Sequence, residues 1–197
     1  MSISEVLSAT RDQLSGKWLQ GIATLVVYGI ISALLGSVAV GALVLGHLSV
    51  GLALWSLKIS RGQDASIENL FGGFKNIVSP LVAYLLFVVA IVFGIIFLII
   101  PGIVLALGLS QTFYILADDS ERDGFQALKD SWNMMKGHKT TYFMMHLRFF
   151  LLGILCLFTL GIGFFFLAPY VAVANANFYL AINGGGHDSF DAEYRVD

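Results

Sequence analysis

Long apolar runs without charged side chains are the feature that most limits how this chain can fold. Residues 81–100 contain no charged side chain, and neither do residues 149–160. A helix rises about 1.5 Å per residue, so about 20 apolar residues cross a hydrocarbon layer roughly 30 Å thick. The 197 residues are 57% hydrophobic and 12% charged, which leaves more apolar surface than one soluble core could cover. We therefore expect a polytopic α-helical membrane protein.

Six runs approach the length of a membrane span, and they predict an all-α bundle of about six transmembrane helices. The runs cover residues 19–40, 42–59, 78–99, 102–117, 142–160 and 164–182. The run at 102–117 is the shortest, and it spans fully only if its flanks contribute. Uncharged breaks rich in Gly or Pro, at 36–41, 101–102 and 161–163, pair the runs into three hairpins. We expect no broken helix beyond these turns.

The positions of the cations predict the orientation of the hairpins. Ten of the eleven Lys and Arg residues lie outside both the membrane-deep parts of the runs and the three turns, and Arg148 is the exception. Segments rich in Lys and Arg stay on the cytoplasmic side of a membrane. We therefore expect the turns outside and both termini in the cytoplasm.

A short amphipathic stretch precedes each hairpin. The apolar side chains of each stretch share one helical face: Ile3, Val6, Leu7 and Leu14, then Ile67, Leu70, Phe71 and Phe74, then Phe125, Leu128, Trp132 and Met135. We interpret these stretches as interfacial helices on the cytoplasmic side, with Asp64 and Ser120 as the N-caps of the second and third.

This pattern of interfacial helix and hairpin recurs about every 60 residues. It favours three pseudo-repeats, at about 1–60, 64–118 and 121–182, within a single membrane domain at 1–183. The alternative is that any two helical hairpins look alike. Residues 184–197 read as a flexible cytoplasmic tail because three consecutive glycines open it.

Several motifs from residue 51 onward resemble a known family. They are DASIENLFGGF at 64–74, IIPG at 99–102, FYILADD at 113–119, ALKDSWNMMKGHK at 127–139, LGIG at 160–163, APY at 168–170 and NFYLAI at 177–182. These stretches resemble the bacterial integral-membrane family catalogued as domain of unknown function 975. The resemblance implies a multi-pass protein of a bacterial cytoplasmic (inner) membrane and carries no established reaction. The first hairpin is compact here, and His146 and Arg148 depart from the more neutral family pattern.

No catalytic, cofactor or metal motif emerges from the sequence. Phosphate-binding loops and nucleophile elbows are absent, and the four histidines lack zinc spacing. The net charge of −2 and the lack of a basic stripe argue against a nucleic-acid partner. Cys156 lies alone in an apolar run, so an intrachain disulfide is impossible. We therefore expect no enzyme and no cofactor, and a membrane-embedded enzyme is the least favoured alternative.

Polar side chains inside the runs are the candidate site, because such groups are costly in lipid. Gln111, Tyr114 and Asp118 follow helical spacing and form one polar ridge that leads to the cytoplasmic edge. Asn175 and Asn177 could extend a path on the sixth helix, although hydrogen bonding between helices is the simpler interpretation.

The fifth run carries the remaining candidates, His146 and Arg148. Arg148 lies about eight residues into the run, so its side chain could snorkel back to the interface. Alternatively, it could face the bundle and pair with Asp118 or Asp119. His146 is about 200° around the helix from Arg148, so the two point in different directions. Packing is the simpler interpretation of His146, with a proton relay as the alternative.

Two functions remain open at this point. A non-enzymatic accessory or lipid-interacting component needs helix seams and an exposed face for membrane lipids, a membrane-protein partner or a second copy. A small-molecule or lipid transporter needs a polar path along the fourth, fifth and sixth helices. A cavity bounded by Gln111, Tyr114, Arg148 and Asn175 would favour transport.

Overall fold

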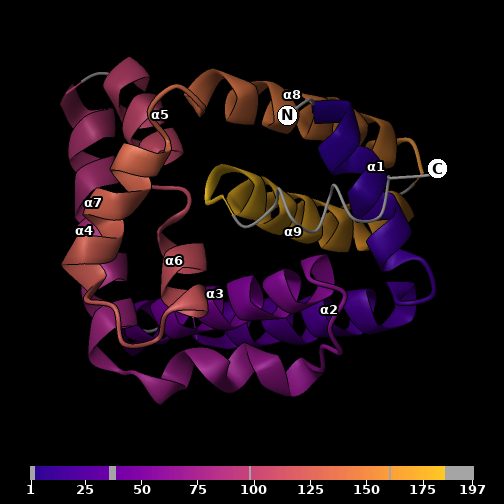
Figure 1. Cartoon of the computed structure of the whole chain (residues 1–197), viewed down its shortest axis with the longest axis horizontal. Helices are drawn as coiled ribbons and strands as arrows, with labels where there is room; N and C mark the ends of the chain where they lie inside the picture. Colours follow the sequence, from indigo (N-terminus) through magenta and orange to yellow (C-terminus); the bar gives the residue numbers. More distant parts are fainter. Residues whose placement is uncertain (1–2, 36–38, 98, 160, 185–197) are drawn as a thin grey trace.

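The computed structural model describes residues 3–35, 39–97, 99–159 and 161–184, and all regular structure in them is helical. The elements, shown in Figure 1, are α1 (Ile3–Leu14), α2 (Trp18–Leu35), α3 (Ala39–Ser60), the 3₁₀ helix η1 (Ile67–Lys75), α4 (Val78–Phe97), α5 (Ile99–Gly108), α6 (Thr112–Asp118), α7 (Gly124–Met134), α8 (Lys139–Leu157) and α9 (Ile162–Ile182). The all-α class is confirmed. Apart from Gly184, the predicted tail at 184–197 lies outside the described residues.

Several helices are long and apolar enough to cross a membrane. Three stretches qualify alone: Pro101–Asp118, Lys139–Leu157 and Ile162–Ile182. Two bent pairs, α1 with α2 and η1 with α4, raise the number to five if each pair is one span, and Val44–Ser60 is a shorter apolar helix. The described residues thus contain three to five candidate spans.

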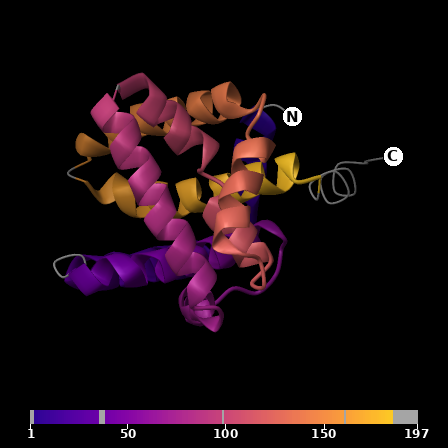
Figure 2. The same cartoon turned by 90° about the vertical axis from the view of Figure 1, so that its left-hand side faces the viewer.

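The helices that the prediction groups into hairpins contact each other, although α3 packs more extensively on η1, α6 and α9 than on α2. α2 packs on α3, α4 on α5, and α8 on α9. In Figure 2 the C-terminal ends of α2, α4 and α8 lie toward the left of the molecule. α7 and the C-terminal end of α9 lie toward the right. The second pair is strongly tilted relative to α2 and α3 in that view. The turn predicted at 101–102 is misplaced, because Pro101 and Gly102 lie in the first turn of α5, where proline is favoured.

The fourth run is not one continuous helix, so the expectation of no broken helix is wrong. α5 ends at Gly108 and α6 begins at Thr112, with a turn between them. The Thr112 amide donates to the Leu109 carbonyl at 3.2 Å, and the Gln111 amide donates to Ser131 Oγ at 3.1 Å. A side chain of α7 thus replaces a helical hydrogen bond and stabilises the interruption.

The three short amphipathic segments are helices, and two of them turn sharply into the helix that follows. The bend is 97° between α1 and α2 and 93° between η1 and α4. The predicted N-caps at Asp64 and Ser120 are wrong. Ser66 begins η1, with its amide donating to Asn69 Oδ1 at 2.9 Å, and Asp123 caps α7 by accepting from two amides at 3.1 Å. Both observed caps lie closer to their helices, within reach of the free amides.

Each short segment packs on the second helix of another hairpin. η1 packs on α3, α7 packs on α6, and α1 packs on α9. The contact of η1 with α3 is backbone to backbone, because a Cβ at Gly51 would lie 1.8 Å from the Leu70 carbonyl oxygen. A Cβ at Gly73 would lie 2.0 Å from the His47 carbonyl oxygen. Only glycine permits this approach.

The core lies where α3, α6 and α9 meet. One buried cluster joins Val50 and Leu57 of α3, Leu116 of α6, and Ala176 and Tyr179 of α9. α8 lies outside, with 17% of its candidate span buried against 50% for α9. Its exposed apolar side chains, among them Phe143, Leu147, Phe150, Leu151 and Leu155, form a face that lipid or another apolar surface would cover.

Candidate functional site

A polar cluster joins the C-terminal ends of α3, α6 and α9. Arg61 Nη2 donates to Asp118 Oδ1 at 2.5 Å, and Tyr179 OH donates to Asp118 Oδ2 at 3.1 Å. Asn183 Nδ2 donates to the Tyr179 hydroxyl oxygen at 3.1 Å. The Arg61 and Asp118 side chains are 37% and 25% exposed, so the ion pair lies at the edge of the core. Asp118 therefore links three helices.

Asp118 is the member of this cluster that the sequence identifies as a candidate, whereas its charged partner Arg61 is not identified. It lies 57 residues from Asp118, and only the fold brings the two together. The sequence does carry one indication of this pairing. Arg61 and Asp118 both lie at the end of the second helix of a predicted hairpin. Hairpins that pack side by side would place such residues at the same end.

Gln111 and Tyr114 lie at the broken helix and are used in packing. Gln111 is fully buried, and its Nε2 donates to Ser110 Oγ at 3.0 Å. Its Oε1 has no hydrogen-bond partner among the described residues. Tyr114 OH donates to the Ala172 carbonyl at 3.4 Å, and its ring stacks on Tyr179 with 5.8 Å between centroids. Tyr114 and Asp118 thus meet at Tyr179, whereas the Gln111 side chain bonds to Ser110 and takes no part in that contact.

Arg148 and His146 take no part in this cluster. Arg148 is exposed on α8, and the suggested pairing with Asp118 or Asp119 is wrong, because those carboxylates pair with Arg61 and Arg122. The helix places Arg148 on its outer face. His146 is half-buried, with its ring 4.3 Å from that of Tyr142. The two side chains therefore point in different directions, as the spacing predicts.

Asn177 joins α9 to the first helix. Its Nδ2 donates to Thr10 Oγ1 at 2.9 Å and to Gln13 Oε1 at 2.7 Å. Gln13 in turn donates to the Ser60 carbonyl at 2.9 Å, which brings the end of α3 into the network. Asn175 Oδ1 is buried without a partner in the described part of the chain. Asn177 thus holds helices together, as the simpler interpretation of the sequence has it.

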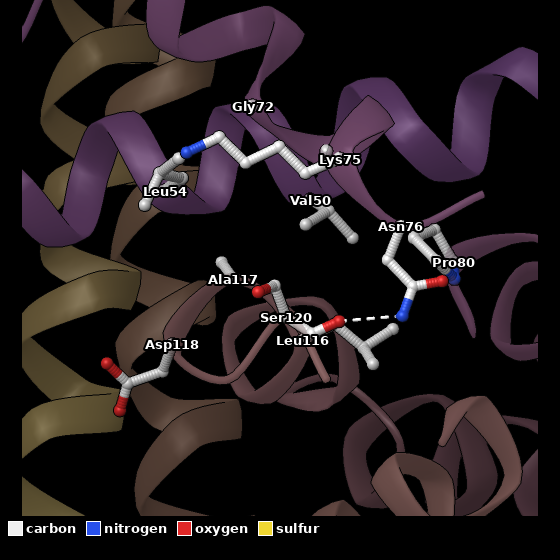
Figure 3. A pocket seen from close by; sticks show the side chains of 11 residues that line it. Val50, Leu54, Gly72, Lys75, Asn76, Pro80, Leu116, Ala117, Asp118 and Ser120 are labelled. Atoms are coloured by element: carbon white, nitrogen blue, oxygen red, sulfur yellow. Dashed lines mark hydrogen bonds between the residues drawn. The ribbon is translucent and has the colours of Figure 1, made fainter. Parts of the chain in front are cut away.

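A small pocket of about 110 Å³ lies beside the polar cluster. Its wall is formed by Val50, Leu54, Gly72, Gly73, Lys75, Asn76, Pro80, Leu116, Ala117, Asp118 and Ser120. Figure 3 shows the apolar side chains between the polar groups of Lys75, Asn76, Ser120 and Asp118. Of the seven sequence candidates, only Asp118 borders it. The cavity anticipated among Gln111, Tyr114, Arg148 and Asn175 does not correspond to this pocket.

The chemistry available here is hydrogen bonding and charge pairing. Within the residues that the structure describes, no three His, Cys, Asp or Glu side chains gather as a metal site requires. The candidates for binding a ligand are therefore the polar groups at the rim of the pocket.

Comparison with known proteins identifies the family. A family profile described as a protein of unknown function, DUF975, matches residues 87–185, which is just over half of the chain. The motif at 64–74 lies outside the matched part. No curated protein and no solved structure matches the chain. The chain therefore belongs to the DUF975 family.

Proposed function

We propose that this protein is a multi-pass component of a bacterial cytoplasmic membrane, with six crossings in three hairpins and both termini in the cytoplasm. The pairwise packing of α2 with α3, α4 with α5 and α8 with α9 supports three hairpins. The charges of Arg61, Lys75, Asp118 and Arg122 gather near the ends of α3, η1 and α6. By the positive-inside rule this end is cytoplasmic.

The three hairpins are pseudo-repeats in this proposal. The support is cyclic packing, in which the short segment of each unit lies on the second helix of the preceding unit. η1 lies on α3, α7 lies on α6 and also on α4, and α1 closes the ring on α9. The middle unit differs from the other two because its second helix is interrupted between α5 and α6.

The function that the geometry supports best is that of a non-enzymatic accessory or lipid-interacting component. One observation carries this proposal: polar side chains that could have lined a path instead join helices. Tyr114, Asp118 and Asn177 each hydrogen-bond to another helix. In lipid such bonds stabilise helix association by about 0.6 kcal/mol each. The apolar outer face of α8 is available to lipid or to a partner.

Water accessibility tests the proposal. In a Cys156→Ala background, we would place single cysteines at Gln111, Tyr114 and Asn175, and a control at the exposed Ser120. The full chain in liposomes is then treated with a charged, membrane-impermeant thiol reagent on each side. We expect modification at 120 from the cytoplasmic side and none at 111, 114 or 175. Modification at positions 111, 114 and 175 would contradict an accessory role.

Transport is the second candidate, and the broken fourth span favours it. Interrupted helices bind substrates and ions in many transporters because their free backbone groups face a cavity. Here the Gly108 carbonyl and the Gln111 amide both bond to Ser131. The unpartnered Gln111 Oε1 is the group that a substrate could use. Reagent access to position 111 from either side would favour this candidate.

A further inference from the structure

One lysine, Lys75, and one carboxylate, Asp118, line the pocket beside the polar cluster. In Figure 3 the Lys75 side chain extends across the pocket toward Leu54. Lys58 does not line the pocket itself, but it follows the lining residue Leu54 by four positions on α3, so it lies one turn further along the same face. Neither lysine forms an ion pair with any residue in the described part of the chain.

The carboxylate at the rim does not offset these two lysines. Asp118 already accepts from Arg61 Nη2 at 2.5 Å and from Tyr179 OH at 3.1 Å. Its charge is therefore balanced by Arg61. The ligand that fits the remaining charge is an anion.

Hydrogen bonds hold the opposite wall in place. Asn76 Nδ2 donates to the Ser120 carbonyl at 2.7 Å, and Asn76 Oδ1 accepts from the Val78 and Ser79 amides at 3.2 and 3.3 Å. The wall therefore ties the start of α4 to the segment after α6. A pocket of about 110 Å³ has room for a few waters or one phosphate-sized group.

An exposed apolar face adjoins the pocket on the same segment. Phe71, Phe74, Ile77 and Val78 are all exposed, although they flank Lys75 and Asn76 in the chain. A soluble phosphate compound has no apolar part that would cover this surface. The acyl chains of a phospholipid would cover it while the headgroup reaches the lysines.

We propose that this pocket binds the phosphate group of an anionic phospholipid, with Lys75 and Lys58 as its counter-charges and the acyl chains on the apolar face of η1 and the start of α4. This inference rests on the proposed placement in a membrane with the charged end at the cytoplasmic interface. The inference specifies the class of lipid headgroup and the place on the protein where that headgroup would bind.

Lipid titration of the full chain in detergent tests the site. The probes are dihexanoyl phosphatidylglycerol, dihexanoyl phosphatidylcholine and inorganic phosphate, and the readout is the thermal unfolding midpoint. The variants are Lys75→Gln and the double variant Lys58→Gln with Lys75→Gln. Lys129→Gln is the matched control, because Lys129 is exposed on α7, and no residue of α7 lines the pocket.

We expect phosphatidylglycerol to raise the midpoint more than phosphatidylcholine does. Each lysine substitution should weaken the apparent affinity for phosphatidylglycerol about fivefold, and Lys129→Gln should leave it unchanged. Equal affinity in Lys75→Gln and Lys129→Gln would overturn the site. An equal shift with inorganic phosphate would overturn a lipid as its occupant. Either failure would leave the thiol-access result, and with it the proposed function, standing.

Discussion

Replacing Gly51 with alanine tests the packing of η1 on α3, on which the pocket depends. A Cβ there would lie 1.8 Å from the Leu70 carbonyl oxygen and 2.4 Å from its carbon. Ordinary contacts begin at 3.4 Å, so the two segments must separate by about 1.6 Å. The obstacle is backbone, so a change of side-chain rotamer cannot relieve it.

The expected cost of Gly51→Ala is about 3 kcal/mol, at the upper end for overpacking, because Leu70 is fully buried and would lose contacts as η1 moves. The assay is unfolding of the full chain in mixed micelles by increasing SDS, followed by tryptophan fluorescence. Trp55 on α3 is fully buried and reports on this core.

Gly29→Ala is the matched control for this experiment. A Cβ at Gly29 meets nothing within 4 Å, and the residue lies within α2. Alanine should therefore leave stability unchanged or raise it by up to about 1 kcal/mol. Wild-type stability of Gly51→Ala would refute the close approach of η1 to α3.

Three further variants test the polar contacts in the same unfolding assay. Asp118→Asn should lower the free energy of unfolding by about 1 kcal/mol, because its ion pair with Arg61 is partly exposed and screened. Asn177→Leu should cost about 1 kcal/mol through its two lost bonds, and trypsin should cleave faster at Arg11 as α1 loosens. Arg148→Leu should change stability by less than about 0.5 kcal/mol, because the side chain is exposed.

Two controls accompany Asp118→Asn, and a contradicting outcome is defined for each of the other two variants. Arg61→Gln combined with Asp118→Asn should cost less than the sum of the two single changes, and strict additivity would show that the pair is not coupled. Arg122→Gln removes a different exposed ion pair, the one with Asp130, whose hydrogen bond raises the pKa of Arg122. This variant should have little effect on the free energy of unfolding. Unchanged cleavage at position 11 in Asn177→Leu would argue against the bonding of α1 to α9. A large loss in Arg148→Leu would mean that this residue faces the bundle.

The sequence predicts the positions of the helices well, because run length and apolar spacing decide them locally. α8 and α9 agree with their runs to within three residues at each end. The break between α5 and α6 was missed because its stabilising partner, Ser131, lies 20 residues after Gln111. The polar residues at 110–112 mark this position in the run, but they carry no local sign of a contact supplied by another helix.

The candidate site was predicted less completely than the fold. Asp118 was identified from its place at the end of a run, but its partner Arg61 was not, because charge pairing depends on how hairpins pack. Arg148 was a candidate because it lies deep in an apolar run, but its side chain is exposed on α8. Spacing gives relative directions along one helix, and only tertiary packing gives the absolute direction.

The bonding of α1 to α9 has a consequence for the synthesis of the protein. Tyr170 OH donates to the Leu7 carbonyl at 3.0 Å, and Asn177 binds Thr10, so residues more than 160 positions apart hold each other. The ribosome makes α1 before α9. In the proposed membrane arrangement, α1 must therefore wait at the membrane surface, with its apolar face against lipid, until α9 has been inserted. The contact of α1 with α9 thus forms only after α9 has been made, and a chain truncated before α9 would lack it.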